Sequence, residues 1–252
     1  MAMPEKVKSL REAAWAENIK TIVYALLIAL VIRTFLFQPF NIPTGSMIPT
    51  LLIGDYLFVS KYSYGYSRHS LPFSPALFSG RIFGGEPERG DIAVFKLPTD
   101  NRTDYIKRVI GLPGDEIQMR DSVLYINGQA VPRERIEDFL ERDGHGNVRR
   151  HPQYRETLPN GVSYTTLDLV PNGLGDNTGV YRVPEGHYFM MGDNRDNSSD
   201  SRVPSAVGYV PVENFVGKAQ VIFFSTDGTA RLWTFWRWFS AARWDRMFDG
   251  LY

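Results

Sequence analysis

The 252-residue chain contains no cysteine, which excludes disulfide bonds, thiolate nucleophiles and thiolate metal sites. It also has no charge imbalance, because 28 Lys and Arg residues offset 28 Asp and Glu residues. Without net positive charge or a basic stripe, nucleic acid is not an expected partner. The length is sufficient for one large domain, or for a domain that carries an insertion.

Histidine is scarce, and no common catalytic motif surrounds it. Three of the four histidines lie in polar, loop-like stretches, and His187 begins a predicted strand. The chain has neither a Gly-x-Ser-x-Gly nor a His-Glu-x-x-His motif. The acidic turn that starts at Asp193 has Arg195 at its third position and no glycine at its sixth, unlike a calcium loop. A Ser-His-Asp triad and a metal site are therefore poorly supported, whereas a serine with a lysine base fits the composition.

Long apolar runs are rare as well, and the only one covers residues 21–37. As a helix these 17 residues span roughly 25 Å, the short end of what crosses a bilayer. No small-x-small cleavage site follows the run, which favours an uncleaved anchor over a secretory signal. Four Lys or Arg residues precede the run and none occurs from 38 to 60. The positive-inside rule therefore predicts a cytoplasmic segment at 1–19, a transmembrane helix at 20–38 and an extracytoplasmic remainder.

A stretch just past this anchor has the features expected around a nucleophile. Pro43 and Pro49 bracket Ser46, and Gly45 directly precedes it. The prolines restrict the backbone, and the glycine lets a ligand approach the chain closely. A hydroxyl on such a rigid segment, nine residues beyond the apolar run, suits chemistry at a membrane surface. The alternative is a Pro/Gly linker in which Ser46 is an ordinary solvated serine.

The remainder of the chain predicts turn-rich β structure. Lys107 and Arg108 lie on opposite faces of a strand predicted at 105–110, so at least one of them should be partly buried. Of the two, only lysine can lose its proton at working pH, because burial lowers its pKa while arginine stays charged. Lys107 is therefore a candidate general base, and a buried lysine paired with a carboxylate is the alternative.

Four segments together resemble bacterial type I signal peptidases, in the order that the family has them: 43–51, 54–55, 89–115 and 192–202. The resemblance covers most of residues 20–225. It implies an endopeptidase of the bacterial inner membrane that removes signal peptides from exported preproteins after a small-x-small motif, through a Ser–Lys dyad and an acyl-enzyme. The implied fold is mainly β, with a coiled antiparallel catalytic core formed by 39–116 and 184–226 and an inserted β region at 117–183.

The resemblance also assigns roles to single residues. Ser46 would be the nucleophile and Lys107 the general base. The Ser46 backbone N–H and the Thr44 hydroxyl would form the oxyanion hole, with threonine where the family often has serine. The supporting residues would be Ser198, which orients the lysine, and Asp200 and Arg202, which hold its turn. Side chains expected to contact substrate are Phe40, Ile42, Met47, Tyr105 and Ile106. No metal or organic cofactor is implied, and the expected partners are preproteins and the lipid bilayer, with the enzyme a monomer.

The C-terminal segment, 227–252, departs from the family pattern. Apolar residues recur there at helical spacing, with arginines between them: Leu232, Phe235, Trp236 and Phe239. This predicts an amphipathic helix over 231–248 that lies in a membrane interface, and a helix packed on the β core is the alternative.

Two other functions stay open from the sequence. One is a Ser–Lys processing protease of a pilus or conjugation system. The other is a non-enzymatic, membrane-anchored β module in which Ser46 and Lys107 are structural. A self-cleaving repressor is disfavoured, because the chain has an anchor and no DNA-binding segment.

Overall fold

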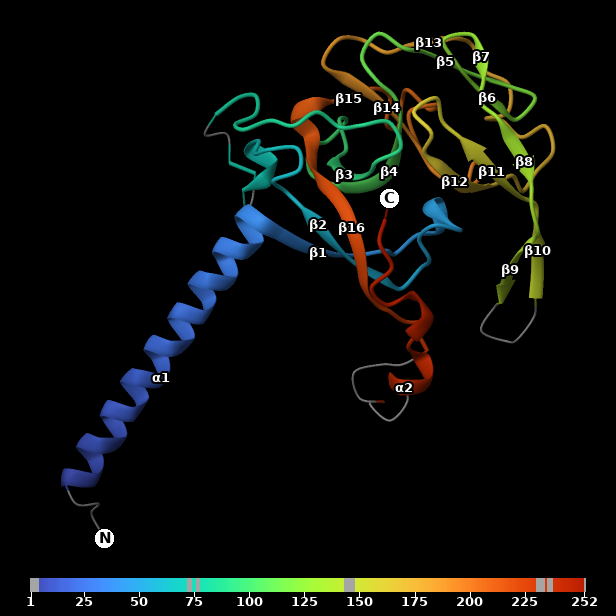
Figure 1. Cartoon of the computed structure of the whole chain (residues 1–252). Coiled ribbons are helices and arrows are strands. Elements are labelled where there is room, and N and C mark those ends of the chain that lie inside the picture. Colours follow the sequence, from blue (N-terminus) through green and yellow to red (C-terminus); the bar gives the residue numbers. More distant parts are fainter. Residues whose placement is uncertain are drawn as a thin grey trace.

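The computed structural model describes residues 5–71, 74–75, 78–142, 148–229, 234 and 238–251. Helix α1 (Glu5–Val31) continues into a π-helical turn, η1 (Ile32–Leu36). Within the described residues, Trp15–Leu36 is the one helical segment long and apolar enough to cross a membrane, with a mean hydropathy of 2.0 and 6% of the segment buried. Figure 1 shows α1 projecting away from the β strands as a single rod. The predicted apolar helix is therefore present, but it gives way to a strand at Phe37.

One curled antiparallel sheet positions the candidate site. Its strand order is β1-β2-β16-β3-β4-β14-β15. The long strand β16 contains register shifts where it pairs with β2 and with β3, and such bulges bend a strand and increase its twist. The strands of this sheet are β1 (Phe37–Asn41), β2 (Asp55–Ser60), β3 (Ile92–Lys96), β4 (Asp104–Gly111), β14 (His187–Met191), β15 (Val210–Pro211) and β16 (Phe215–Ser225).

Strand β3 shows why the centre of this sheet is apolar on both faces. Ile92 and Val94 belong to one buried cluster, together with Leu57, whereas Ala93 and Phe95 belong to a second. Successive side chains point to opposite faces of a strand, so a continuous apolar run is expected where both faces are covered. Each fully buried large apolar side chain stabilises the fold by roughly 1.5–3 kcal/mol. Together, the two clusters hold the strands that carry the candidate site.

The chain between β4 and β14 forms three smaller sheets. Figure 1 shows them, in green to yellow, on the side of the large sheet away from α1. The Asn127-Gly128 hairpin has the positive φ angles, 52° and 77°, that its type I′ turn requires. One sheet contains β5 (Glu116–Arg120), β6 (Val123–Ile126), β7 (Gln129–Ala130) and β13 (Tyr181–Arg182); the second contains β8 (Arg133–Arg135), β11 (Gln153–Thr157) and β12 (Ser163–Leu167); the third contains β9 (Phe139–Arg142) and β10 (Val148–His151). The mainly β prediction is confirmed, and the predicted domain boundaries stay a prediction.

The long loop between β2 and β3 is held by one arginine. Arg81 donates to the carbonyl oxygens of Tyr64 at 2.7 Å, Gly65 at 2.8 Å and Val212 at 2.8 Å. A short 3-10 helix, η3 (Arg68–Ser70), lies within the same loop. The loop therefore has little secondary structure but many fixed backbone contacts.

The C-terminal segment differs from the predicted amphipathic helix. Residues 230–233 and 235–237, which include most of the proposed apolar face, lie outside the described residues. Helix α2 (Trp238–Ala241) is a single turn, and a 3-10 turn, η6 (Trp244–Arg246), follows it. Isolated bridges at Thr226–Ala242 and Val221–Gly250 return the chain along β16.

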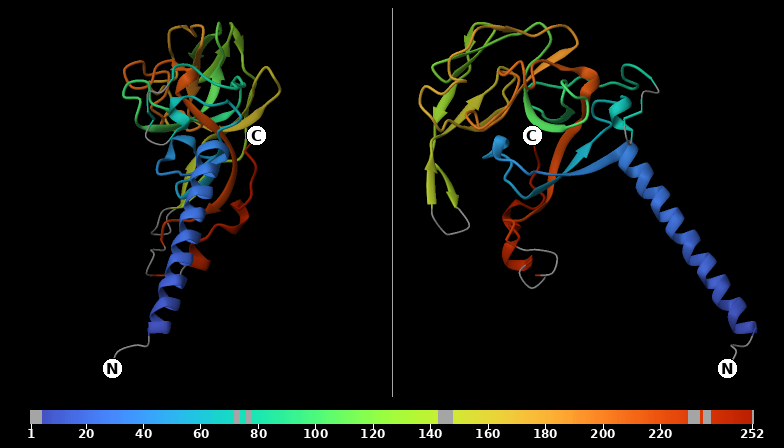
Figure 2. Two further views of the ribbon diagram at one scale, coloured as in Figure 1. Left: turned by 90° about the vertical axis from the view of Figure 1, so that its left-hand side faces the viewer. Right: turned by 180° about the vertical axis from the view of Figure 1, so that it is seen from behind.

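Charge pairing explains where that helix ends. Arg246 donates to the buried Asp55 carboxylate at 2.6 Å, and Arg243 lies 3.8 Å from the same group. These contacts hold the tail against β2, so the helix does not extend beyond Ala241 in the described part. Phe239 and Phe248 remain 78% exposed. Figures 1 and 2 show α2 and α1 projecting from the same side of the β strands.

Candidate active site

Ser46 lies in a rigid turn and not in a flexible linker. It belongs to a 3-10 turn, η2 (Gly45–Met47), between β1 and β2. The turn that follows β14 clamps this segment, because the Asn194 backbone N–H donates to the Ser46 carbonyl oxygen at 3.1 Å and its side-chain amide donates to the Gly45 carbonyl oxygen at 3.1 Å. Met47 is fully buried in the core and does not line the cavity described below, so the structure lends no support to its predicted contact with substrate, which stays a prediction.

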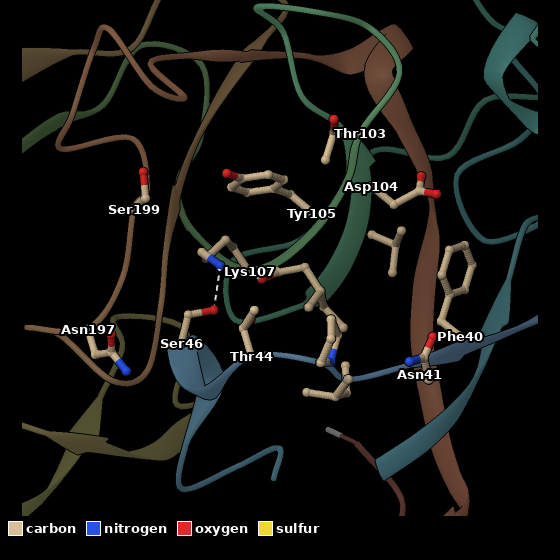
Figure 3. Close-up of a pocket in the computed structure, with 14 residues that line it drawn as sticks. Phe40, Asn41, Thr44, Ser46, Thr103, Asp104, Tyr105, Lys107, Asn197 and Ser199 are labelled. Atoms are coloured by element: carbon tan, nitrogen blue, oxygen red, sulfur yellow. Dashed lines mark hydrogen bonds between the residues drawn. The ribbon is translucent and has the colours of Figure 1, made fainter. Parts of the chain in front are cut away.

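Lys107 lies on strand β4, and its side chain extends to Ser46. Its strand, β4, pairs with β3 on one side and β14 on the other. The Lys107 Nζ lies 2.7 Å from the Ser46 Oγ and also donates to the Ile106 carbonyl oxygen at 2.9 Å. Figure 3 shows the amine pointing at the hydroxyl. The fold thus brings two groups 61 positions apart in the sequence into hydrogen-bond contact.

Burial is the main influence on the Lys107 amine. Only 4% of the residue is exposed, and this desolvation lowers its pKa from 10.5 to about 8, although the charges of Asp200 and Asp193 act in the opposite direction. Among the described residues, no carboxylate lies within 4.0 Å of the amine. The alternative of a lysine in a buried ion pair therefore does not describe this group.

The neighbouring cation, Arg108, has a different environment. Its guanidinium forms a two-point contact with the Asp193 carboxylate, at 2.9 and 2.7 Å, and donates to the Gly90 carbonyl oxygen at 2.8 Å. Burial alone would lower the pKa of Arg108, but the Asp193 charge raises it above its ordinary value. The Thr50 hydroxyl also donates to Asp193 at 2.5 Å. This network joins β4, the serine segment and the turn after β14 behind the Ser46–Lys107 pair.

Asp200 and Arg202 stabilise the turn after β14. The Asp200 carboxylate accepts two hydrogen bonds from the Arg202 guanidinium, both at 2.9 Å, and one from the Gly192 backbone N–H at 3.0 Å. Burial by itself would raise the pKa of Asp200, but the Arg202 charge and these hydrogen bonds hold it below its ordinary value. Asp200 is fully buried, so the pair fixes the turn from inside the protein.

Ser198 does not form the hydrogen bond to Lys107 that the sequence analysis expects. Its Oγ is buried and has no partner of good geometry among the described residues. It lies close enough to Asp200 to contribute to the lowered pKa of that carboxyl. It also lies close to the Gly192 Cα, where a Cβ atom would come within 2.2 Å of the Ser198 Oγ and within 2.5 Å of the Ser46 backbone carbonyl oxygen. Position 192 therefore requires glycine.

The Ser46–Lys107 pair lines an open cavity of about 560 Å³. The cavity includes four of the five residues expected to contact substrate, namely Phe40, Ile42, Tyr105 and Ile106. Thr44 is exposed and lines the cavity beside Ser46, as Figure 3 shows. Among the described residues, the backbone hydrogen bonds formed outside helices and strands include none donated by the Ser46 N–H. The remaining lining residues are Asn41, Pro43, Val94, Thr103, Asp104, Asn197 and Ser199.

Comparisons with known proteins show the family of the chain. Residues 15–224 match the protein family described as signal peptidase, peptidase S26. The chain belongs to this family. It is therefore a serine peptidase of the signal peptidase type, and the non-enzymatic alternative is excluded.

Named relatives are similar over most of their length. A signal peptidase I of Rickettsia typhi is 49% identical over 221 residues, which cover 84% of this chain and 81% of the relative. A signal peptidase I of Rickettsia conorii is 50% identical over 214 residues, which cover 82% and 78%. A crystal structure of a signal peptidase I from Enterococcus faecalis is 27% identical and covers 53% of this chain and 97% of that chain, with a TM-score of 0.31, a global similarity too low to bear on the fold.

Several residues around the candidate site have contacts that the sequence does not indicate. Thr50, Asp193 and Asn194 fall inside segments that carry the family resemblance, which indicates that these positions matter but does not indicate their contacts. Glu156 lies outside those segments; it binds Arg195 through two hydrogen bonds of 2.9 and 2.5 Å and ties β11 to the turn after β14. No sequence pattern indicates a pair between positions so distant.

The structure offers little support for a metal near the dyad. In the described part of the chain, one group of three carboxylates comes close together: Asp168, Asp176 and Asp196. These groups already accept hydrogen bonds, from the Arg133 guanidinium and from the backbone N–H groups of Gly173 and Leu169 respectively. None of the three lines the cavity that contains Ser46.

Proposed function

We propose that this chain is a membrane-anchored signal peptidase that cleaves signal peptides from exported preproteins with a Ser46–Lys107 dyad. The observation that supports it is the 2.7 Å approach of a buried lysine amine to a serine hydroxyl, inside an open cavity. The amine has a lowered pKa of about 8 and no carboxylate partner among the described residues, so it can be neutral at working pH. A neutral amine has the free electron pair that a general base needs.

The proposed reaction proceeds through an acyl-enzyme. Neutral Lys107 accepts the Ser46 proton as the Ser46 Oγ attacks the scissile carbonyl carbon. The negative oxygen that forms is stabilised by the Ser46 backbone N–H and the Thr44 hydroxyl. Protonated Lys107 then gives its proton to the leaving amine, and the mature protein departs. Lys107 next takes a proton from a water molecule, which attacks the acyl group. Lys107 then returns this proton to the Ser46 Oγ as the bond to the acyl group breaks, which releases the signal peptide and restores the neutral amine.

The supporting residues keep these groups in position before substrate binds. Asn194 clamps the backbone around Ser46, and the Arg108–Asp193 pair joins this segment to β4. Asp200 and Arg202 hold the turn that carries Ser198. We propose that the Ser198 hydroxyl orients the Lys107 amine in the substrate complex, because a buried hydroxyl without a partner costs free energy and hydrogen bonds in active sites tighten on binding.

The cavity supports a preference for small side chains on the substrate. Large side chains line the cavity, namely Phe40, Ile42, Tyr105 and Ile106. Phe40 and Ile106 pack against the buried core, so these side chains cannot move aside easily to admit a large substrate residue. Small residues at alternate substrate positions fit such shallow walls, in agreement with a small-x-small motif. An extended substrate presents alternate side chains to the same face.

Helix α1 supports a membrane anchor, and the Lys and Arg residues that precede it favour a catalytic domain outside the cytoplasm. The apolar segment Trp15–Leu36 is almost wholly exposed in the protein, as expected for a lipid-facing span. With the N-terminus cytoplasmic, protease added to intact spheroplasts should digest the β domain. Protection of that domain would contradict the proposed orientation. The enzyme is proposed to act as a monomer.

The direct test is preprotein cleavage by the full-length chain in detergent. Wild type should release a mature protein whose new N-terminus follows a small-x-small sequence, as read by mass spectrometry. Ser46→Ala should abolish cleavage, and Ser199→Ala is a matched control, because it removes an exposed hydroxyl from the same cavity. Equal loss in both variants would contradict the assignment of Ser46. A panel of unrelated preproteins distinguishes the two proteolytic functions. A signal peptidase of general export should cleave many of them, whereas a processing protease of a pilus or conjugation system should cleave a single class only.

A further inference from the structure

A second large cavity lies where α1 meets the β strands. Its volume is about 900 Å³, and it shares only Asp104 with the cavity that contains Ser46. Its walls come from the end of α1, the loop after β2 and the β3–β4 hairpin. Figure 1 shows the end of α1 beside the teal loop that holds η3 (Arg68–Ser70).

Direct contacts fix this cavity relative to the apolar helix. The Lys61 backbone N–H donates to the Leu36 carbonyl oxygen at 3.0 Å, and the Tyr66 hydroxyl donates to the Phe35 carbonyl oxygen at 2.7 Å. The Phe35 and Tyr66 rings also meet edge to face, with centroids 5.7 Å apart. If α1 spans the bilayer, the cavity therefore lies at the membrane surface on the side of the β domain.

Positive side chains outnumber negative ones in the cavity. Two Asp residues line it, and both are already engaged: Asp104 pairs with Lys96 at 2.8 Å, and Asp100 accepts from the Thr103 hydroxyl and from the Arg102 backbone N–H. Five Lys or Arg residues line it, namely Arg33, Lys61, Arg68, Lys96 and Arg102. Among the described residues, no carboxylate lies within 4.0 Å of the charged groups of Arg33, Lys61 or Arg102.

Two of the lining residues are buried donors with unused capacity. Lys61 is 3% exposed, and its amine donates to a single acceptor, the Ser70 carbonyl oxygen, at 2.5 Å. His69 is 4% exposed, and its Nε2 accepts from the Arg68 Nε at 3.2 Å. The proton of the neutral ring therefore lies on Nδ1, which is buried and has no partner among the described residues. Burial and the nearby Arg33 charge lower the pKa of Lys61 to about 8, as expected for a cation without a counter-ion.

We propose that this cavity binds the phosphate group of an anionic phospholipid. A phosphate supplies a negative charge and several acceptor oxygens, which match the cations of Arg33, Lys61 and Arg102 that have no carboxylate partner among the described residues. Leu30 forms part of the wall and is half exposed, so an acyl chain can follow α1 away from the phosphate. This continuity with the apolar helix favours a lipid over a soluble phosphate. The inference rests on the proposed membrane anchor and not on the Ser46–Lys107 chemistry.

The test counts lipids retained by the full-length chain. The protein is reconstituted in nanodiscs of phosphatidylcholine with increasing phosphatidylglycerol, released into detergent and analysed by native mass spectrometry. The double variant Arg33→Gln with Arg102→Gln should bind phosphatidylglycerol about 25-fold more weakly, at roughly fivefold per cation removed near an anionic headgroup. Lys61→Met should weaken binding about fivefold. The matched control is Arg120→Gln with Arg182→Gln, which removes two exposed cations elsewhere.

The outcomes separate this inference from the proposed activity. Ser46→Ala should lose cleavage and still retain the lipid, whereas the double variant should lose the lipid and cleave a peptide in neutral detergent at the wild-type rate. Equal retention of phosphatidylglycerol by wild type, the double variant and its control would overturn the site. In a second arm, inorganic phosphate is added to lipid-free protein in detergent. Binding of phosphate as tight as that of the lipid would overturn the lipid assignment in favour of a soluble ligand.

Discussion

The pH dependence of cleavage tests the proposed state of Lys107 quantitatively. With a pKa of about 8, about 10% of the amine is neutral at pH 7, whereas an ordinary lysine with a pKa of 10.5 would be neutral in only about 0.03% of molecules. The difference is about 300-fold in competent enzyme, or about 3 kcal/mol. The sign follows from the charge: protonation removes the base, so activity falls as pH drops below the pKa. The value of kcat/KM should therefore rise about tenfold from pH 7 to pH 9 and then level off.

The assay uses a peptide substrate without titrating groups, with kcat/KM measured from pH 6 to 10.5. Asp200→Asn provides a directional control, because the Asp200 charge raises the pKa of Lys107. Its removal should move the inflection to lower pH, in addition to any loss of rate. A profile that is flat, or that inflects above pH 10, would refute the account of Lys107 as a buried base. An inflection that moves upward in Asp200→Asn would refute the electrostatic reasoning.

Three further predictions concern the groups around the dyad. Thr44→Val should lower kcat roughly 100- to 1000-fold while Thr44→Ser stays near wild type, and equal rates for the two variants would remove this hydroxyl from the oxyanion hole. Ser198→Ala should lower kcat/KM on the order of 10- to 1000-fold, and a change below twofold would show that Ser198 does not orient Lys107. Glu156→Gln should lower the free energy of unfolding by about 3–5 kcal/mol in denaturant titrations, because it leaves Arg195 buried without its counter-ion; a loss below about 1 kcal/mol would contradict this estimate.

Much of the fold follows from local patterns. Alternating apolar residues predict β2, where Leu57 and Val59 are buried and Tyr56 and Phe58 are more exposed. The Asn-Gly pair fixes a hairpin turn through its own backbone preferences. The candidate nucleophile and base are also recognisable, because prolines bracket Ser46 and an apolar strand carries a lysine. These signals lie within a few residues of the feature that they predict.

Features that depend on distant partners are not predictable in this way. Strand β1 contains Pro39 and continues an apolar run, so its sequence resembles the end of the helix. It forms a strand because it pairs with β2 at the edge of the sheet, where proline is tolerated. The C-terminal segment also depends on a distant partner. Its apolar spacing predicts a helix, but Arg246 binds Asp55, 191 positions away, and this contact holds the chain against the sheet. Pairing over such distances leaves no periodic signal in the sequence.

The burial of Met47 and the contacts of Arg108 also depend on tertiary packing and not on local sequence patterns. Both residues lie next to the proposed nucleophile or base in the sequence, and only the packing decides which of these neighbours face the cavity. Met47 points into the core, and Arg108 is neutralised by Asp193 behind the site. The orientation of a side chain relative to a cavity is therefore a tertiary property.

The central claim is that Lys107 acts as a neutral base for Ser46, and a comparison of two variants tests it most directly. Lys107→Arg keeps the positive charge and a long side chain but cannot accept a proton, whereas Lys107→Met keeps the volume and removes the charge. Preprotein cleavage by the full-length chain should be abolished to the same extent in both variants, while each retains the fold by circular dichroism. Substantial cleavage by Lys107→Arg would show that a cation at this position is sufficient and would contradict the proposed mechanism.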